Sequence, residues 1–202
     1  MEIVKQSHEI INISDNILEI IEKAGRTCYK SEDKITKGSA EKFVATLIKH
    51  GHEAMIEFGD IAVKFITNRG VTHEIVRHRL CNFAQESTRY VKYGKDMEFI
   101  EPVWWKETNG YKRNLFISLL ENSASVYTDL IDDGWKPQQA REVLPNALKT
   151  EIVVKANCRE WRHLLKLRCS KAAHPQIREL MIPLLNDLKV EVPIIFDDIM
   201  VD

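Results

Sequence analysis

Residues 77–90 read Arg-His-Arg-Leu-Cys-Asn-Phe-Ala-Gln-Glu-Ser-Thr-Arg-Tyr, a dense gathering of cationic and hydrogen-bonding side chains. Arginine binds phosphate through a planar, two-pronged set of N–H donors. Three guanidinium groups this close together need negative charge beside them, and the adjoining sequence offers only Glu74 and Glu86. We therefore predict that the missing anion is a ligand that binds at this stretch.

The segments on either side of this stretch set its structural context. Residues 60–68 alternate between more and less apolar side chains, which predicts a strand with one face better buried than the other. Gly70 is expected to break that strand, residues 71–79 to form a short helix, and residues 80–93 to form a loop that passes into a strand. On such a helix Arg77 and Arg79 would point in roughly opposite directions, toward two ligands or two parts of one large ligand.

Helical and strand patterns are intermixed along the rest of the chain, with no repeat and no clear linker. The other predicted elements are strands within residues 3–13, 97–102 and 149–156, and helices at 16–28, 37–51, 109–133, 137–143, 157–167 and 174–188. We predict an α/β fold of the α+β type, with a mixed, largely antiparallel sheet flanked by helices. A single domain is expected to cover residues 1–202, since 202 residues suffice to bury a substantial core.

Composition excludes several classes of protein. The 29 basic and 30 acidic residues give a net charge of -1, whereas nucleic-acid-binding proteins usually carry a basic excess. The four cysteines form no C-x-x-C pair, so a zinc site and a disulfide framework are not expected, and no metal is predicted. The N-terminus is no signal peptide and no apolar run has membrane length, which favours the cytoplasm.

Each basic motif also has a plain structural interpretation. An isolated Arg-His-Arg triplet is most often a solvated turn, and Arg141 alone is most often a surface residue paired with Glu142 or Asp133. Arg168 lies at the edge of an apolar helical stripe, where an arginine commonly extends its charged end into water. The short distance in sequence from the triplet to Ser87 and Arg89 favours a ligand site instead. Ser87 is not in a G-x-S-x-G context, so its hydroxyl is interpreted as a phosphate ligand rather than a nucleophile.

The chain resembles the flavin-dependent thymidylate synthases, whose signature is Arg-His-Arg, seven residues, then serine. Here the signature spans residues 77–87. Two further blocks match in order and spacing, namely Arg141 ahead of Val143-Leu144-Pro145 and residues 157–168. The resemblance covers roughly residues 40–185.

The resemblance implies a transferase, specifically a methyltransferase and flavoprotein of dTMP biosynthesis. Such an enzyme converts dUMP to dTMP, takes the carbon from methylenetetrahydrofolate, and uses FAD that NADPH or another carrier reduces. It also implies a homotetramer whose active sites are built from several subunits, with no nucleic acid or membrane as a partner.

Roles follow from the resemblance by matched position. Arg168 is assigned as the catalytic residue, lying against the uracil ring and favouring its N3-deprotonated form. The residues assigned to dUMP are Glu74, Arg77, Gln85, Ser87, Arg89, Arg141 and Arg168. The residues assigned to FAD are Arg77, His78, Arg79, Gln85, Asn157, Arg159 and His163.

Three positions depart from the pattern of the family, which often has serine at 82, asparagine at 84 and histidine at 58. Here these residues are Asn82, Ala84 and Phe58. Two other functions are weighed against the enzyme. One is a non-catalytic nucleotide- or RNA-binding module that uses the same arginines, and the other is a set of structural salt bridges between subunits.

Overall fold

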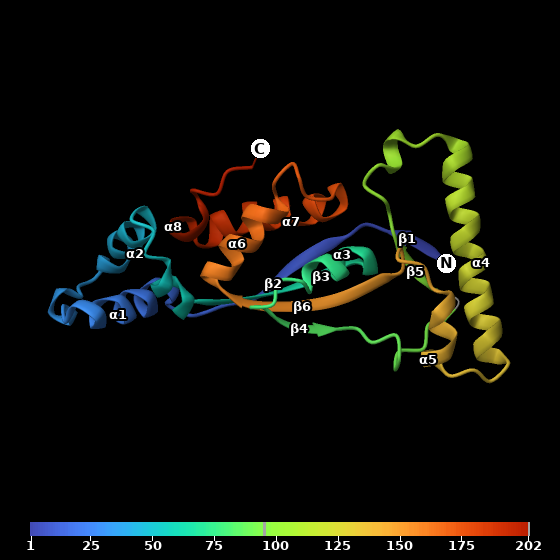
Figure 1. The fold of residues 1–202 in the computed structure, drawn as a ribbon, viewed down its shortest axis with the longest axis horizontal. Coiled ribbons are helices and arrows are strands. Elements are labelled where there is room, and N and C mark those ends of the chain that lie inside the picture. Colours follow the sequence, from blue (N-terminus) through green and yellow to red (C-terminus); the bar gives the residue numbers. More distant parts are fainter. Residues whose placement is uncertain (95, 202) are drawn as a thin grey trace. The chain divides into compact units, whose positions relative to one another are not determined.

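The computed structural model describes residues 1–94 and 96–201 (Figure 1). These residues form two compact units: unit 1 comprises Met1–Ser7, Phe65–Arg77 and Ala84–Ile152, and unit 2 comprises His8–Lys64, His78–Phe83 and Val153–Asp202. The single domain expected for residues 1–202 stays a prediction, and its residues Lys95 and Asp202 lie outside the described residues.

The strands form the predicted mixed, largely antiparallel arrangement. A four-stranded antiparallel sheet has the order β2-β3-β6-β4. Its strands are β2 (Ser7–Ile13), β3 (Asp60–Asn68), β6 (Lys149–Asn157) and β4 (Asn82–Gln85). In unit 1, β1 (Glu2–Val4) and β5 (Glu98–Ile100) pair in parallel, with Glu2 opposite Glu98. The predicted fold class, a sheet flanked by helices, is confirmed.

Alternation along β3 confirms the strand predicted for residues 60–68. Ile61, Val63, Phe65 and Thr67 are fully buried, whereas the residues between them are only partly buried. Since successive side chains of a strand point to opposite faces, one face of β3 belongs to the core. Helix α6 packs there, because the indole nitrogen of Trp161 donates a hydrogen bond to the carbonyl oxygen of Ile61 at 3.0 Å.

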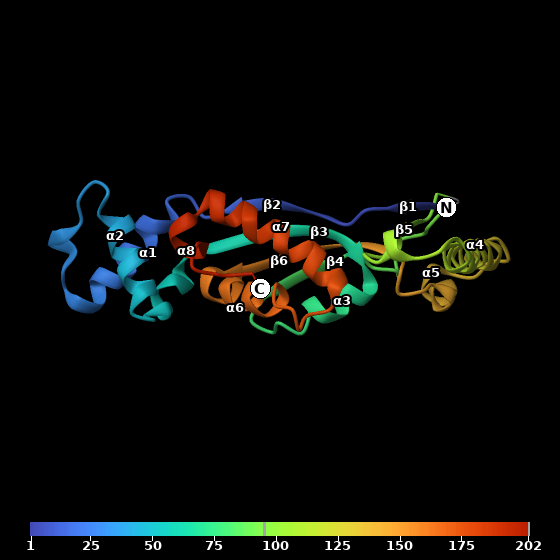
Figure 2. The same ribbon diagram turned by 90° about the horizontal axis from the view of Figure 1, so that it is seen from above.

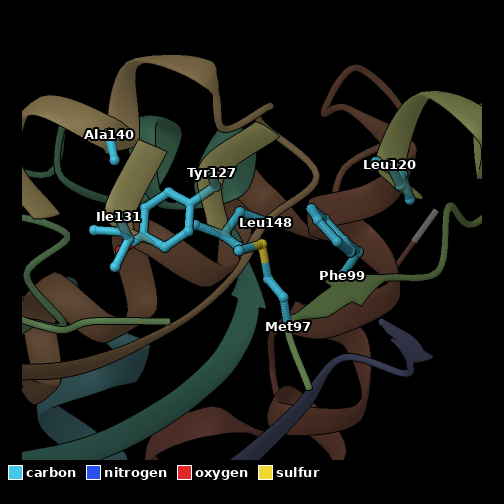
Figure 3. Close-up of a cluster of buried hydrophobic side chains, with 7 residues drawn as sticks. All are labelled: Met97, Phe99, Leu120, Tyr127, Ile131, Ala140 and Leu148. Carbon is cyan, nitrogen blue, oxygen red and sulfur yellow. The ribbon is translucent and has the colours of Figure 1, made fainter. Parts of the chain in front are cut away.

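Unit 1 has its own hydrophobic core, drawn in Figure 3. The seven buried residues of this core are Met97, Phe99, Leu120, Tyr127, Ile131, Ala140 and Leu148. They come from β5 and the residue just before it, from the long helix α4 (Gly110–Asp132), from α5 (Pro137–Ala140) and from the segment ahead of β6. The 3-10 helices η3 (Trp105–Glu107) and η4 (Arg141–Val143) complete the unit. This core holds α5 and η4 beside α4, and so fixes the position of Arg141.

Unit 2 carries most of the other helices. They are α1 (Ile17–Tyr29), η1 (Glu32–Lys34), α2 (Ser39–Lys49), η2 (Glu53–Phe58), α6 (Cys158–Arg168), α7 (Pro175–Glu191) and α8 (Pro193–Phe196). Figure 2 shows α7 lying along one face of the strands of this unit, next to α6. The short elements η1, η2 and α8 were not predicted, because three to six residues are too few to show a helical period.

Asparagine side chains set the starts of three helices. The Oδ1 atom of Asn157 accepts a hydrogen bond from the Glu160 amide at 2.9 Å, and this cap starts α6 close to the beginning of the helix predicted for residues 157–167. Asn109 caps α4 in the same way, at 3.0 Å from the Lys112 amide. The long helix ends where it was predicted to end, next to Gly134, whose φ of 96° suits a residue without a Cβ.

The helix predicted for residues 71–79 is wrong at both ends. Asn68 accepts a hydrogen bond from the Val71 amide at 2.8 Å, and this cap starts α3 (Arg69–Ile75) directly after β3, with Gly70 inside the helix. The helix ends at Ile75, and residues 78–81 form a turn in which the Cys81 amide donates to the His78 carbonyl. The turn buries the imidazole ring of His78 and the thiol of Cys81. The prediction that Arg77 and Arg79 point in opposite directions from one helix is therefore wrong, because neither residue is helical.

The order of loop and strand predicted for residues 80–93 is also reversed. Strand β4 comes first, at Asn82–Gln85, and a tight turn at residues 87–90 follows it.

Among the described residues, no helix combines the length and the apolar character that crossing a bilayer requires.

Candidate functional site

The turn after β4 presents Ser87 at the surface of unit 1. The Ser87 carbonyl accepts hydrogen bonds from the amides of Tyr90 (3.1 Å) and Val91 (2.9 Å), and its hydroxyl accepts one from the Arg89 amide at 3.3 Å. Within the described residues, this hydroxyl has no hydrogen bond to a basic side chain of the kind that activates a nucleophilic serine. Its proton is free to be donated, as a ligand-binding role requires.

Two arginines from the sequence prediction converge on this turn. Arg141 Nη1 lies 3.4 Å from the hydroxyl oxygen of Thr88, and Arg89 Nε donates to Oε1 of Gln138 on α5 at 3.2 Å. The expected ion pair between Arg141 and Glu142 is present, at 3.6 Å, and both side chains are exposed. Arg141, more than 50 positions later in the sequence, thus shares one surface with Ser87 and Arg89.

The amide of Gln85 is oriented by two buried threonines of unit 1. Gln85 Nε2 lies 2.9 Å from Thr72 Oγ1 and 3.4 Å from Thr150 Oγ1. The Thr72 hydroxyl already donates to the carbonyl oxygen of Arg69 at 3.0 Å, so it can only accept from Gln85. This direction of donation fixes which end of the Gln85 side chain is the NH2 group. The carbonyl oxygen of Gln85 is then left as an acceptor for a ligand.

The first and third residues of the triplet have exposed guanidinium groups. Within residues 1–94 and 96–201, the side chains of Arg77 and Arg79 have no hydrogen bond and no ion pair. Arg77 belongs to unit 1 and Arg79 to unit 2. Glu74 is half-buried one turn before Arg77. Unpaired charge on two neighbouring arginines agrees with the need for an anionic partner inferred from the sequence.

Unit 2 contains a cavity of about 570 Å³ along one face of α6. Its lining residues are Glu53, Glu57, Leu80, Asn157, Arg159, Glu160, His163 and Lys166. Three residues assigned to the cofactor by the resemblance, Asn157, Arg159 and His163, are therefore brought together. Arg159, His163 and Lys166 share one helical face because they are separated by four and three positions.

Charges within this cavity are partly paired. Arg159 Nη1 lies 2.6 Å from Glu57 Oε1, and this hydrogen bond, together with the carboxylate charge, raises the pKa of the exposed Arg159. Phe58, where the family often has histidine, is 57% exposed and does not line the cavity. The pairing with Glu57 orients the Arg159 side chain along the rim of the cavity.

The opposite face of α6 anchors the helix. Trp161, Leu164 and Leu165 are fully buried and belong to the core. The Arg162 side chain is 2% exposed and binds Asp198 through both terminal nitrogens, at 2.5 and 2.7 Å, and Glu53 at 3.3 Å. Burial would lower the pKa of Arg162, but the hydrogen bond to and the charge of Asp198 reverse this direction, and the net pKa is raised.

Arg168, at the last turn of α6, is only partly exposed and contacts a buried histidine. Its Nε lies 3.0 Å from His78 Nε2, and His78 Nδ1 lies 3.5 Å from Glu160 Oε1. Burial, and then the charges of Arg168 and His163, lower the pKa of His78 to about 4. His78 is therefore neutral at pH 7. The interpretation of Arg168 as a side chain that extends into water does not fit this contact.

Burial disfavours the nucleophilic form of three thiols. Burial raises the pKa of Cys81 and of Cys158 to about 12 and that of Cys169 to about 11. Thiolates are the reactive form of cysteine, and these groups stay protonated near pH 7. No cluster of three histidine, cysteine or carboxylate side chains suited to a metal ion occurs in the described part of the chain.

Several contacting residues were missed from the sequence. Glu53, Glu57 and Lys166 line the cavity, Thr72 and Thr150 orient Gln85, and no local pattern marks any of them. Glu160 had a signal: a carboxylate three residues after a capping asparagine is common at helix starts. The contact of Glu160 with His78, 82 positions earlier, has no such signal. Whether the assigned residues bind dUMP and FAD stays a prediction.

Comparison with known proteins identifies relatives over nearly the whole chain. Residues 9–194 match the family described as thymidylate synthase complementing protein. A flavin-dependent thymidylate synthase from Corynebacterium efficiens is 34% identical over 203 residues, covering 91% of this chain and 80% of that protein. The enzyme of the same name from Geobacter sulfurreducens is 33% identical over 183 residues, covering 87% of this chain and 78% of that protein.

A solved structure shares the fold. The crystal structure of the UMP/dUMP methylase PolB from Streptomyces cacaoi, bound with 5-Br dUMP, superposes with a TM-score of 0.82 at 22% identity. The match covers 98% of this chain and 96% of that one. The family model and the sequence relatives confirm the resemblance predicted from the signature at residues 77–87: the chain belongs to the family of flavin-dependent thymidylate synthases.

Proposed function

We propose that this protein methylates dUMP to dTMP reductively, with methylenetetrahydrofolate as the carbon donor and FAD reduced by NADPH. As a member of its family the chain is a methyltransferase with FAD as its cofactor. The observation that carries the proposal is the Arg-His-Arg signature, in its family position, with two exposed guanidinium groups that have no partner in the described chain.

The group on unit 1 supports a nucleotide monophosphate as the substrate. A phosphate monoester carries close to two negative charges at neutral pH. Ser87, Arg89 and Arg141 offer a hydroxyl and two guanidinium groups on one surface, and a hydrogen bond to a charged partner contributes about 1.5–3 kcal/mol. The carbonyl oxygen of Gln85 adds an acceptor for an N–H or O–H group of the nucleoside. This set matches the chemistry of dUMP.

The cavity of unit 2 fits part of FAD. Its volume of about 570 Å³ lies in the range of cofactor sites, and Leu80 supplies an apolar wall. Asn157, Arg159, His163 and Lys166 supply donors for carbonyl and phosphate oxygens. When bound, FAD supplies the redox chemistry of the reaction.

Arg168 acts on the uracil ring in this proposal. Methylation at carbon 5 requires electron density in the ring, and loss of the N3 proton supplies it. A fixed positive charge beside the ring stabilises the anion that forms, and guanidinium stays charged even where water is scarce. His78 accepts the hydrogen bond from Nε of Arg168, and the two terminal nitrogens of the guanidinium group also carry N–H donors.

The finer parts of the proposal rest on the family. These are the folate donor, NADPH as reductant, a homotetramer with shared active sites, and a cytoplasmic location. The near-zero net charge argues against the alternative of an RNA-binding module that uses the same arginines.

A titration with dUMP tests the proposed function. Purified protein loaded with FAD should be yellow, and dUMP should change the flavin absorption. Ser87→Ala should need about 10–100 times more dUMP for the same change, because it loses one hydrogen bond to a charged group. Its kcat should fall less than its affinity for dUMP.

The control for this titration is Ser118→Ala, an exposed serine of α4, which should titrate like the wild type. A wild-type protein that stays colourless and takes up no FAD would overturn the proposal. Loss of all chemistry in Ser87→Ala with unchanged dUMP binding would instead give the serine a covalent role.

A further inference from the structure

Glu160, His78 and Arg168 form a chain of contacts inside unit 2. Arg168 Nε lies 3.0 Å from Nε2 of His78, and the other ring nitrogen lies 3.5 Å from Glu160 Oε1. His78 and Glu160 are 6% and 7% exposed, so both polar groups need protein partners. The two contacts supply these partners on opposite sides of the imidazole ring.

The chemistry of the three groups fixes the position of the histidine proton. A guanidinium group only donates hydrogen bonds, so Nε2 of His78 must be the acceptor and carry the lone pair. In a neutral imidazole the proton then sits on Nδ1, the nitrogen that faces the carboxyl group of Glu160. With its pKa lowered to about 4, His78 remains in this neutral form near pH 7. A proton on Nε2 would point at the N–H of Arg168.

We propose that His78 is a positioning residue that holds the Arg168 guanidinium by accepting its Nε–H, and that Glu160 fixes the tautomer of His78. The inference rests on the proposed role of Arg168 at the uracil ring. The Nε edge of the guanidinium group is bound to the protein, and this bond restricts the direction of the terminal nitrogens. Because a displacement of about 1 Å can lower a rate about 10²-fold, this orientation affects turnover.

Two substitutions of His78 distinguish a role of its hydrogen-bond acceptor in positioning Arg168 from a role of the side chain in filling space. His78→Leu removes the acceptor, and kcat should fall about 10²-fold with a smaller change in the KM for dUMP. His78→Gln places an amide oxygen near the position of Nε2, and it should restore kcat to within about tenfold of the wild type, since the acceptor is kept. The control is His73→Leu, an exposed histidine of α3, which should leave kcat unchanged.

The position of the proton can be read without turnover. In protein labelled with 15N-histidine, long-range 1H–15N correlation should show neutral His78 with its proton on Nδ1 at pH 7. Arg168→Ala should allow the other tautomer, whereas Lys171→Ala, an exposed neighbour, should not. This measurement on the wild type stands even where a His78 variant does not fold.

The outcomes distinguish this inference from the proposed function. Wild-type protein that forms no dTMP overturns the proposed function, and the spectrum still tests the contact of His78 with Arg168. If the wild type turns over and His78→Leu keeps its kcat, the positioning role is wrong. It is equally wrong if His78→Gln is as impaired as His78→Leu, or if the proton of His78 lies on Nε2.

Discussion

Arg168→Ala is expected to fold and to bind FAD while its kcat falls about 10²–10³-fold. The loss has this size because the variant removes a fixed charge that stabilises a developing anion in the transition state. Folding should persist because the buried anchors of α6 are Trp161, Arg162, Leu164 and Leu165, and these residues are unchanged. The kcat of Arg168→Lys should lie between those of the wild type and Arg168→Ala, since lysine keeps the charge but loses the Nε–H that His78 accepts.

Three measurements on one preparation check this expectation: flavin absorption, thermal unfolding and the rate of dTMP formation. Lys171→Ala, which removes a nearby exposed charge, serves as the control and should retain the wild-type rate. An Arg168→Ala protein with normal turnover would remove the uracil-activating role. If Arg168→Ala lowers oligomeric assembly or thermal stability and leaves the rate of dTMP formation unchanged, the interpretation of Arg168 as a structural salt bridge is favoured.

Arg162→Ala is expected to destabilise unit 2 by about 3 kcal/mol. The side chain is 2% exposed, and its removal leaves Asp198, Glu53 and the Ile195 carbonyl without their shared donor. Breaking a buried ion pair by deleting one partner costs about 3–5 kcal/mol, and the half-exposed Asp198 places the effect at the lower end. The pKa of Asp198, which its hydrogen bond to Arg162 lowers, should rise in the variant.

Urea unfolding of protein without FAD measures this loss. The control is Lys155→Ala, which breaks an ion pair between exposed side chains. In this pair Lys155 Nζ lies 3.0 Å from Asp60 Oδ2. Such pairs contribute about 0.2–1 kcal/mol. Equal midpoints for the two variants would contradict the assignment of Arg162 as the anchor of α6.

Local patterns predicted the long elements well. The strand at Asp60–Asn68 and the helices α4 and α6 follow from alternation, helical spacing and asparagine caps, all of which act within a few residues. The helix at residues 71–79 failed because its end depends on partners far away in sequence. Burial of His78 against Glu160 and Arg168 requires a turn that no neighbouring residue signals.

In the candidate site, too, local features could be predicted from the sequence and contacts with distant residues could not. The types of residue that bind an anion could be predicted from residues 77–90, since guanidinium chemistry is local. Their partners could not be predicted, because Gln138 beside Arg89 and Glu57 beside Arg159 are brought there by tertiary packing. His78 is the clearest case. The signature assigned it to FAD, which stays a prediction, and no local pattern indicated its contacts with Arg168 and Glu160.

Release of the hydrogen from carbon 5 of dUMP tests the central claim most directly. The protein is incubated with FAD, NADPH, methylenetetrahydrofolate and dUMP that carries tritium at carbon 5. Tritium should appear in water together with dTMP, and the release should require both FAD and the folate. A protein that takes up no FAD and releases no tritium, but binds polynucleotides with a steep dependence on salt, would contradict the account.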